Sequence, residues 1–300
     1  MSRASGCRAS KAEEKESLMP TGPILVLGGA TGMLGRAVTA ALAARGVEHD
    51  VVERDRFDLC RDETIASGIG QGARVVINCT GWTNVDAAEA QEAEATVING
   101  SGVGKLAARC KQIGAVLVHY STDYVFAGQA TRPYAVDERR APLNAYGRSK
   151  AVGEELLEAS GAEHLLIRTS WVYAPWGKNF VRTIVGAAQK RPTLRVVNDQ
   201  RGRPSSAEQL AETSLRLLDA GGRGTFHASD GGECTWFEFA RAAVARAGLS
   251  CQVDPCSSDE YPSPARRPSY SVLDLSRTEA LIGPLVSWED SLASVIPRLE

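Results

Sequence analysis

The sequence lacks an excess of charge of either sign: 34 Lys and Arg stand against 36 Asp and Glu, a formal net charge of −2. This balance does not suggest the basic stripe of a nucleic-acid-binding protein or the polybasic patch that binds membrane surfaces. The sequence also lacks an apolar run long enough to span a bilayer. We therefore expect no nucleic-acid partner and no contact with a membrane.

Cysteines at metal-binding spacing are absent too. The seven cysteines are scattered, none forms a Cys-x-x-Cys motif, and Cys251 and Cys256 have no histidines at zinc-finger spacing. Scattered cysteines in odd number are typical of reduced thiols in the cytoplasm. We therefore expect a cytoplasmic protein without a metal site.

The first 21 residues are polar and lack the apolar segment of a secretory signal. We expect residues 1–21 to form a disordered tail. The alternative is that translation starts at Met19, so that the tail does not belong to the native protein.

Strand and helix patterns alternate along the first half of the chain, which is typical of a Rossmann-like, doubly wound parallel sheet in an α/β protein. Short apolar runs predict buried strands at 24–27, 50–53, 74–77, 115–120 and 165–167, with a helical region at 86–112 interrupted at 99–102. Further on, the patterns predict helices at 179–189, 206–219 and 235–247 and strands at 194–197 and 224–227.

These patterns predict two units. Residues 22–175 would form an NAD(P)-binding Rossmann domain, and residues 176–300 would form mainly a smaller C-terminal α/β substrate-binding lobe. Some elements of the second segment would return to the Rossmann sheet. Hydrophobic residues make up 43% of the chain, enough for the cores of two closely joined units.

A glycine motif lies between the first strand and the helix that follows it. Gly29, Gly32 and Gly35 have the spacing GxxGxxG. Glycines there permit a tight turn and a close approach of a pyrophosphate, while the helix N-terminus offers free N–H groups to the phosphates. An ordinary strand–helix turn is the alternative, but this context favours dinucleotide binding.

The second predicted strand ends in an acid about 20 residues beyond the glycine motif. Glu53 at that place would bind the ribose hydroxyls of NAD(H), whereas Arg54 or Arg56 could hold the 2′-phosphate of NADP(H). The sequence leaves both cofactors open. Asp58 and Leu59 could flank the adenine.

Tyr146 and Lys150 are four residues apart, so a helix places them on one face. A lysine beside a tyrosine favours the phenolate, and we expect it to lower the pKa of Tyr146. Such a phenol can donate a proton to a carbonyl oxygen. A solvated surface pair is the alternative, but the glycine motif and the polar strand end at 121–123 favour a catalytic pair.

Taken together, these features resemble the dTDP-4-dehydrorhamnose reductase family of the extended short-chain dehydrogenase/reductase superfamily. The resemblance runs from about Ile24 to Trp288. Besides GxxGxxG and YxxxK, the matching motifs lie at 85–89, 121–126, 142–147, 168–173 and 198–200.

The resemblance implies that NADPH or NADH reduces the C4 ketone of dTDP-4-dehydro-β-L-rhamnose to dTDP-β-L-rhamnose, the last step of dTDP-L-rhamnose synthesis. It implies that Tyr146 is the proton donor, that Lys150 tunes it and holds the nicotinamide ribose, and that Thr122 bonds the reacting oxygen. The residues implied in cofactor binding are Gly29, Gly32, Met33, Leu34, Gly35, Glu53, Arg54, Asp58, Leu59, Gly81, Trp82, Thr83 and Tyr120, with Tyr146 and Lys150. Those implied in contact with the dTDP-sugar are Thr122, Asp123 and Trp171.

Two positions depart from the family. Pro204 is followed by Ser205 where members often have threonine. Members that form magnesium-bridged dimers have a glutamate where this chain has Ala37, although Glu208 matches another of their acids. We therefore doubt a magnesium site and expect a monomer or an ordinary homodimer.

Other functions remain open within this resemblance. A dehydratase would need a glutamate after Asp123, where this chain has Tyr124. A related reductase of another nucleotide-bound 4-keto-6-deoxysugar fits the same motifs. So does a non-catalytic regulatory subunit like the β subunit of methionine adenosyltransferase, although residues 171–173 look like the reductases.

Overall fold

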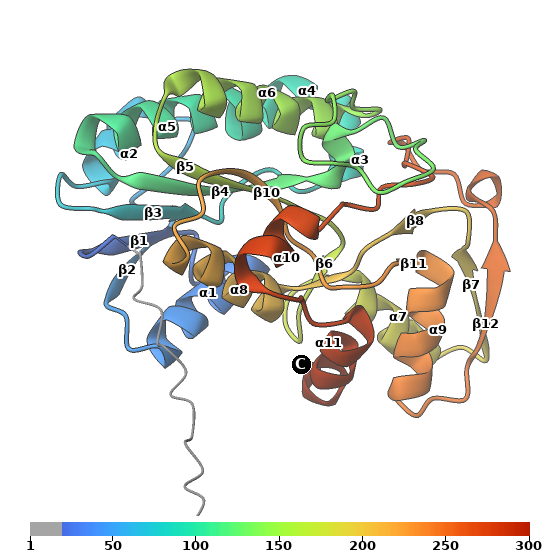
Figure 1. Cartoon of the computed structure of the whole chain (residues 1–300). Helices are drawn as coiled ribbons and strands as arrows, with labels where there is room; N and C mark the ends of the chain where they lie inside the picture. Colours follow the sequence, from blue (N-terminus) through green and yellow to red (C-terminus); the bar gives the residue numbers. More distant parts are fainter. Residues whose placement is uncertain (1–19) are drawn as a thin grey trace, which may run out of the picture.

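The computed structural model describes residues 20–300, so the expected tail at 1–21 lies outside the described residues except for its last two. A six-stranded parallel sheet in the order β10-β5-β4-β3-β1-β2 forms the centre (Figure 1). Its strands are β1 (Ile24–Leu27), β2 (His49–Val52), β3 (Val75–Asn78), β4 (Val116–Thr122), β5 (His164–Thr169) and β10 (Gly224–His227). The predicted doubly wound α/β class is confirmed.

Helices cover both faces of the sheet (Figure 1). One face packs against α1 (Met33–Ala44) and α8 (Ala207–Asp219), and the other against α2 (Asp62–Gly68), α5 (Gly102–Ile113) and α6 (Ala145–Ser160). Each face buries its own apolar cluster. This double burial explains why β1 and β3 read as continuous apolar runs rather than as alternating patterns.

The helical region predicted at 86–112 is divided as its glycines suggested. It consists of α3 (Val85–Ala90), α4 (Glu92–Thr96), a π-helix η1 (Val97–Ser101) and α5. The wide turn of the π-helix brings its backbone close to α6. A Cβ added at Gly153 of α6 would overlap the carbonyl oxygen of Asn99 in the π-helix. Isolated π-turns of this kind occur mostly at functional sites.

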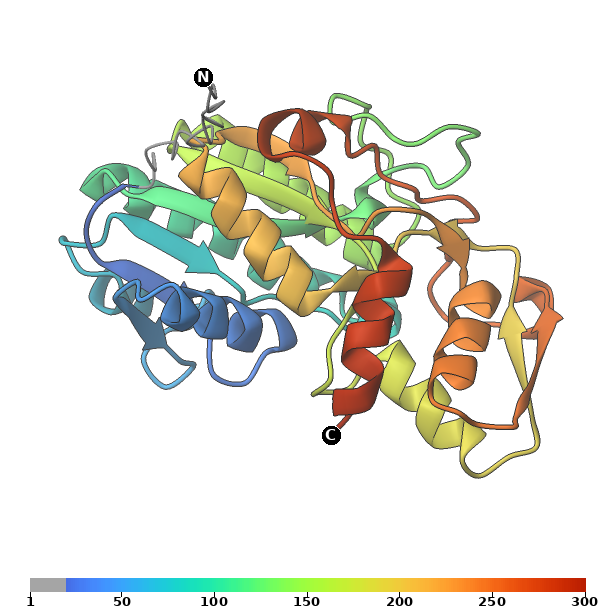
Figure 2. The same ribbon diagram turned by 60° about the horizontal axis from the view of Figure 1, so that its bottom comes forward.

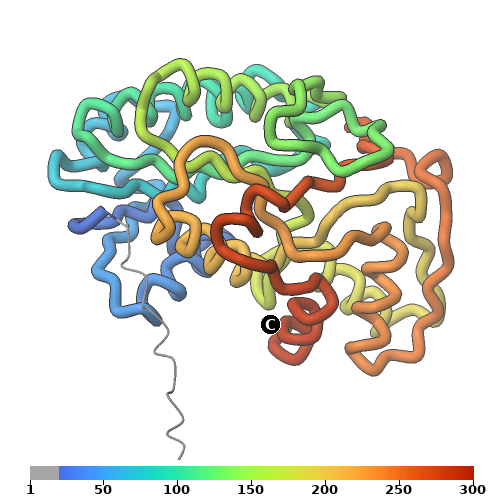
Figure 3. Tube along the Cα trace, viewed as in Figure 1, coloured from blue at the N-terminus to red at the C-terminus, as the bar shows by residue number. Residues whose placement is uncertain are grey.

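The second half of the chain contributes to both parts of the molecule. After β5 the trace leaves the sheet, returns with α8 and β10, and leaves again (Figure 3). β10 extends the sheet beside β5 in parallel, and α8 packs on α1. The strand predicted at 224–227 and the helix predicted at 206–219 therefore lie in the Rossmann layers.

The remaining elements form a smaller lobe beside the sheet (Figure 2). Its core joins α7 (Phe180–Ala188), α9 (Trp236–Arg246) and α11 (Trp288–Val295) to a parallel pair, β7 (Thr193–Val197) with β12 (Gln252–Cys256). Two further short pairs lie outside the six-stranded sheet: β6 (Val172–Tyr173) with β9 (Ser205–Ser206), and β8 (Arg201–Gly202) with β11 (Cys234–Thr235). The helix α10 (Ser276–Ile282) packs back on α8 and β10.

Among residues 20–300, none of the helices is both long enough and apolar enough to cross a membrane.

The contact at Gly153 yields a prediction about stability. We expect Gly153→Ala to lower the free energy of unfolding by about 1–3 kcal/mol, because the new methyl group overpacks the α6–η1 contact. The matched control is Gly186→Ala in α7, where no heavy atom lies within 4 Å of the added Cβ. That change should instead stabilise by about 0.5–1 kcal/mol. Denaturant unfolding of both variants would contradict this if Gly153→Ala were as stable as the control.

Candidate active site

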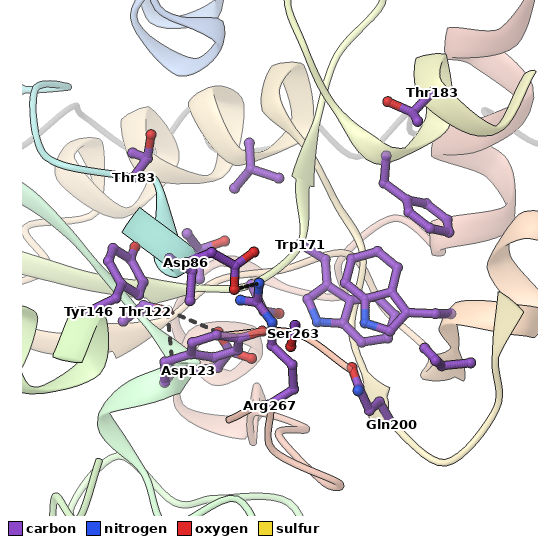
Figure 4. Close-up of a pocket in the computed structure, with 18 of the residues that line it drawn as sticks. Thr83, Asp86, Thr122, Asp123, Tyr146, Trp171, Thr183, Gln200, Ser263 and Arg267 are labelled. Carbon is purple, nitrogen blue, oxygen red and sulfur yellow. Dashed lines mark hydrogen bonds and ion pairs between the residues drawn. The ribbon is translucent and has the colours of Figure 1, made fainter. Parts of the chain in front are cut away.

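A cavity of about 720 Å³ lies where the carboxyl ends of β4 and β5 face the smaller lobe. Ligands bind at this edge in open α/β sheets. Figure 4 shows that side chains of the sheet and of the lobe meet there. Its walls include Thr122, Asp123, Tyr146, Trp171, Trp236 and Arg267.

The glycine motif forms the turn from β1 into α1. Gly32 is the N-cap of α1, no side chain caps the helix, and no acid lies in its first turn. A Cβ on Gly35 would overlap the carbonyl oxygen of Gly28, so the helix packs tightly on the turn. Free N–H groups without a nearby carboxylate in the first turn fit the pyrophosphate of a dinucleotide. Met33 lines the cavity, and Leu34 packs against the core.

The acid at the end of β2 faces the same turn. An oxygen of Glu53 accepts a hydrogen bond from the Ala30 N–H at 2.5 Å. Arg54 is exposed, and the guanidinium of Arg56 turns back to the carbonyl of Val51. The carboxylate is therefore the group next to the glycine motif.

The predicted adenosine residues differ from each other in burial. Asp58 is half-buried, and its carboxylate accepts the Cys60 N–H. Leu59 is 3% exposed and belongs to the core. Neither side chain lines the cavity, and neither do Gly29, Gly32, Gly35, Glu53 and Arg54, so the expected adenosine end lies outside this cavity.

Tyr146 and Lys150 lie on the first turns of α6, at the end of β4. The Asn144 side chain caps this helix by accepting the Gly147 N–H. Lys150 is buried, and its Nζ donates to the carbonyl of Tyr120 at 3.0 Å. The ring of Tyr120 points into the core instead, so only its backbone serves the site.

Burial overturns the expected effect of the lysine on the tyrosine. The pKa of Tyr146 is raised, first because the phenol is buried and then because Asp123 and Tyr124 lie close, while Thr122 works in the opposite direction. The expectation that Lys150 lowers this pKa is therefore wrong for this structure. Tyr146 holds its proton at neutral pH, which is the state required of a proton donor.

Burial acts in the opposite direction on the lysine. It lowers the pKa of Lys150 to about 8, and the charge of Glu154 one turn further along α6 offsets part of this effect. Glu154 itself is buried and is bonded by Arg168 and Arg140. The positive charge of Lys150 next to the phenol of Tyr146 is therefore lost as the pH rises through about 8.

Thr122 ends β4 beside the phenol, and Asp123 follows it directly. The Thr122 hydroxyl donates to one carboxylate oxygen of Asp123 at 3.0 Å (Figure 4). The second oxygen of Asp123 is buried and has no partner among the described residues. Burial raises the pKa of Asp123 to about 7, although the neighbouring hydroxyls of Ser271 and Thr122 oppose the rise. A polar group of a ligand would complete this pair.

Asn99, in the π-helix, is a site residue that the sequence analysis missed. Its side chain accepts the Trp82 N–H at 2.9 Å and donates to the Trp82 carbonyl and to Ser149 at 3.0 Å. A Cβ on Gly81 would lie 3.2 Å from the Lys150 Nζ, so this loop passes directly by the lysine. In the sequence, the interruption of the predicted helix at 99–102 was the feature that could have indicated Asn99.

The loop at 81–83, which the resemblance implies in cofactor binding, follows β3. Trp82 packs with Tyr146 and a small alanine cluster, and its indole N–H donates to the Asn84 carbonyl. Thr83 lines the cavity. The structure thus brings Gly81, Trp82 and Thr83 beside the Tyr146–Lys150 pair.

Two further cavity residues come from distant parts of the chain. Arg267 donates to Asp86 of α3 at 2.8 Å, which ties the segment before α10 to the Rossmann face (Figure 4). Trp236, the first residue of α9, stacks on Trp171 with ring centroids 3.6 Å apart. Neither residue belongs to a motif that the sequence analysis recognised.

Glu208, which matches a magnesium ligand of some family members, is bound by an arginine of the same chain. Arg298 donates to both carboxylate oxygens of Glu208 at 2.7 Å, and Ala37 is buried in the core. Within residues 20–300, no cluster of three or more His, Cys, Asp or Glu side chains could hold a metal ion.

Comparisons with known proteins cover almost the whole chain. Residues 23–300 match the model of a family described as the RmlD substrate binding domain. A dTDP-4-keto-6-deoxy-D-glucose reductase of Streptomyces niveus is 39% identical, over 90% of this chain and 96% of the relative. A dTDP-4-dehydrorhamnose reductase of Burkholderia thailandensis is 40% identical, over 83% and 89%.

A solved structure agrees with these relatives. The dTDP-4-dehydrorhamnose reductase of Bacillus anthracis in complex with NADP superposes with a TM-score of 0.88 at 30% identity, over 93% of this chain and 99% of that one. The resemblance inferred from the motifs is thereby confirmed. The chain belongs to the RmlD substrate binding domain family.

Proposed function

We propose that the protein reduces the C4 ketone of dTDP-4-dehydro-β-L-rhamnose to dTDP-β-L-rhamnose, with NADPH or NADH as the reductant. The observation that carries this is a protonated phenol, Tyr146, beside the Thr122 hydroxyl on the wall of a cavity, with the buried Lys150 behind it. The names of the relatives from Burkholderia thailandensis and Bacillus anthracis support the same reaction.

The residues present fit a nicotinamide dinucleotide. The turn at Gly32 would hold its pyrophosphate, Glu53 its adenosine ribose, and Gly81, Trp82 and Thr83 the nicotinamide end beside Lys150. When bound, the cofactor supplies a hydride to the ketone carbon.

The side chains of the chain handle the proton and the growing negative charge. Tyr146 donates its phenolic proton to the ketone oxygen as that oxygen gains charge. The Thr122 hydroxyl, which can rotate away from Asp123, donates a second hydrogen bond to the same oxygen. The ammonium of Lys150 then stabilises the phenolate that remains, because opposite charges nearby favour the ionised form.

The sugar nucleotide would lie along the cavity. Asp123 offers an oxygen without a partner to a sugar hydroxyl, and Trp171 lines the wall further out.

We propose residues 22–175 as the cofactor-binding domain and 176–300 as mainly the substrate lobe. We also propose a monomer or homodimer that acts in the cytoplasm, in line with the six free thiols of the described residues.

A reductase of another deoxysugar is the second candidate. It is favoured by the relative from Streptomyces niveus, which is named for a dTDP-4-keto-6-deoxy-D-glucose substrate. A regulatory subunit without activity is less consistent with an open cavity next to a protonated tyrosine.

The test is an absorbance assay of NADPH and NADH oxidation with enzymatically made dTDP-4-dehydro-β-L-rhamnose. We expect oxidation of cofactor and formation of dTDP-β-L-rhamnose. Oxidation only with another nucleotide-bound 4-ketosugar would support the second candidate. No oxidation with any of them, together with tight association to a synthetase, would support the regulatory subunit.

Removal of the phenolic hydroxyl tests the proton donor. Tyr146→Phe should lower kcat by about 10²–10⁴-fold, the usual contribution of a general acid, because the ketone oxygen loses the phenol that protonates it. Cofactor affinity and unfolding temperature serve as controls and should change little. Near-normal turnover would remove Tyr146 from the chemistry.

The buried lysine predicts a pH dependence. Because the pKa of Lys150 is lowered to about 8, the ammonium loses its proton as pH rises through that value, and kcat/KM should fall above it. Tyr146, with its raised pKa, stays protonated over the same range. Asp123→Asn removes the carboxyl group of the cavity whose pKa is raised to about 7. A profile without this alkaline fall, in both wild type and Asp123→Asn, would contradict the prediction.

The position of Glu53 predicts the cofactor preference. A carboxylate next to the glycine turn repels a 2′-phosphate, so we expect NADH to bind more tightly than NADPH. Glu53→Gln should shift the ratio of the two dissociation constants toward NADPH by about five- to tenfold, which is roughly 1–1.4 kcal/mol. Fluorescence titration measures both constants. Asp55→Asn, an exposed acid two residues along, is the matched control. An equal shift in both variants would refute a local effect of Glu53.

A further inference from the structure

Trp171 has a backbone conformation that a bulky residue rarely adopts. Its φ of 47° is the only positive value at a non-glycine residue among residues 20–300. A left-handed conformation of this kind costs about 1–3 kcal/mol and persists only where the surroundings enforce it. Two hydrogen bonds hold the segment here: Ser205 N–H donates to the Trp171 carbonyl, and the Ser170 hydroxyl donates to the Arg203 carbonyl.

The indole of Trp171 is covered on both faces. Trp236 stacks on one face, with ring centroids 3.6 Å apart and planes 12° from parallel. A Cβ added at Gly202 would lie 2.8 Å from two carbons of the six-membered ring, Cε2 and Cζ2. Because Trp236 fills the space over the first face, Gly202 must lie against the second.

The two sides of this clamp belong to one unit. Gly202 ends β8, which pairs antiparallel with β11, and the pairing sets Gly202 opposite Cys234. Trp236 follows β11 directly as the first residue of α9. The capping box of Thr235 and Glu238 fixes the start of that helix, and Thr235 also donates to Asn198. Strand pairing and the helix cap therefore hold both sides of the slot that receives the indole.

Only the rim of the indole remains for a ligand. Trp171 lines the cavity, and Figure 4 shows its ring between the Tyr146 end and Gln200. No described residue accepts a hydrogen bond from its indole N–H, and the same holds for Trp236 and Trp288, whereas the indoles of Trp82 and Trp176 both have acceptors. A donor at a cavity wall without a protein acceptor suits an oxygen of a bound molecule.

We propose that Gly202 and Trp236 are positioning residues, which clamp the two faces of Trp171 so that its indole N–H, rather than a ring face, binds an oxygen of the sugar nucleotide. This inference rests on the proposed function for the identity of the ligand. It explains the strained backbone, because the left-handed conformation of Trp171 directs the side chain into the slot. It also excludes stacking of a sugar or base on Trp171, since neither face is free.

Calorimetric titration with the product, dTDP-β-L-rhamnose, tests the clamp. Gly202→Ala keeps the indole but pushes it out of the slot, and Trp171→Phe keeps an aromatic ring but removes the N–H. Each should weaken product binding at least about fivefold, the value of one hydrogen bond. Gly186→Ala adds the same methyl group in the same lobe with nothing within 4 Å, and should bind as wild type does.

Kinetics and a spectroscopic signature separate positioning from mere folding. Stacked indoles give an exciton couplet in circular dichroism, so wild type should show one, Trp236→Phe should lose it, and Gly202→Ala should weaken it. In Gly202→Ala we expect KM for the ketosugar to rise more than kcat falls. Trp236→Phe, which still covers the face of Trp171, should bind product better than Trp236→Leu.

Unchanged product binding in either Gly202→Ala or Trp171→Phe would overturn the inference, as would the absence of a couplet in wild type. If Gly202→Ala or Trp171→Phe fails to fold, Trp236→Phe and Trp236→Leu are compared by the same measurements. Equal affinity of these two variants for the product overturns the inference. Failure of wild type to bind the product would overturn the proposed function as well. Wild-type binding with unaffected variants would overturn the clamp alone.

Discussion

The site depends on how closely α6 approaches the backbone around it. Gly147 lies against the carbonyl of Tyr124, and Gly153 against that of Asn99, at distances that leave no room for a Cβ. This approach sets Tyr146 beside the end of β4 and lets Lys150 reach the carbonyl of Tyr120. Because Gly147 lies between Tyr146 and Lys150 and Gly153 lies one turn beyond, the packing of one helix determines the distance of both groups from the cavity.

Burial then determines the chemistry of the pair. It raises the pKa of the phenol and lowers that of the ammonium, so the site holds a neutral donor beside a charge that is only moderately stable. The cost of a buried charge explains the network behind it, where Glu154 has two arginine partners, Arg168 and Arg140. A neutral phenol suits reduction, in which the tyrosine must give a proton rather than accept one.

The smaller lobe forms one side of the cavity. The β8–β11 pair carries both sides of the slot for Trp171, and Ser205 of β9 bonds the Trp171 carbonyl. The ion pair between Arg267 and Asp86 connects the opposite side of the cavity to α3. A ligand between sheet and lobe therefore meets walls anchored in both units, as suits a substrate that must be aligned with a separately bound cofactor.

The sequence alone determined the features that depend on neighbouring residues: the buried strands such as β1, the glycine turn at Gly32, and the Tyr146–Lys150 spacing on a helix. Their patterns extend over a few residues, where periodicity and backbone freedom act directly. Only the tertiary structure decided the direction of the Tyr146 pKa, since burial comes from the whole fold. It alone showed the roles of Asn99 and Trp236, because their partners Trp82 and Trp171 lie far away along the chain, and no local pattern records a contact at such separation.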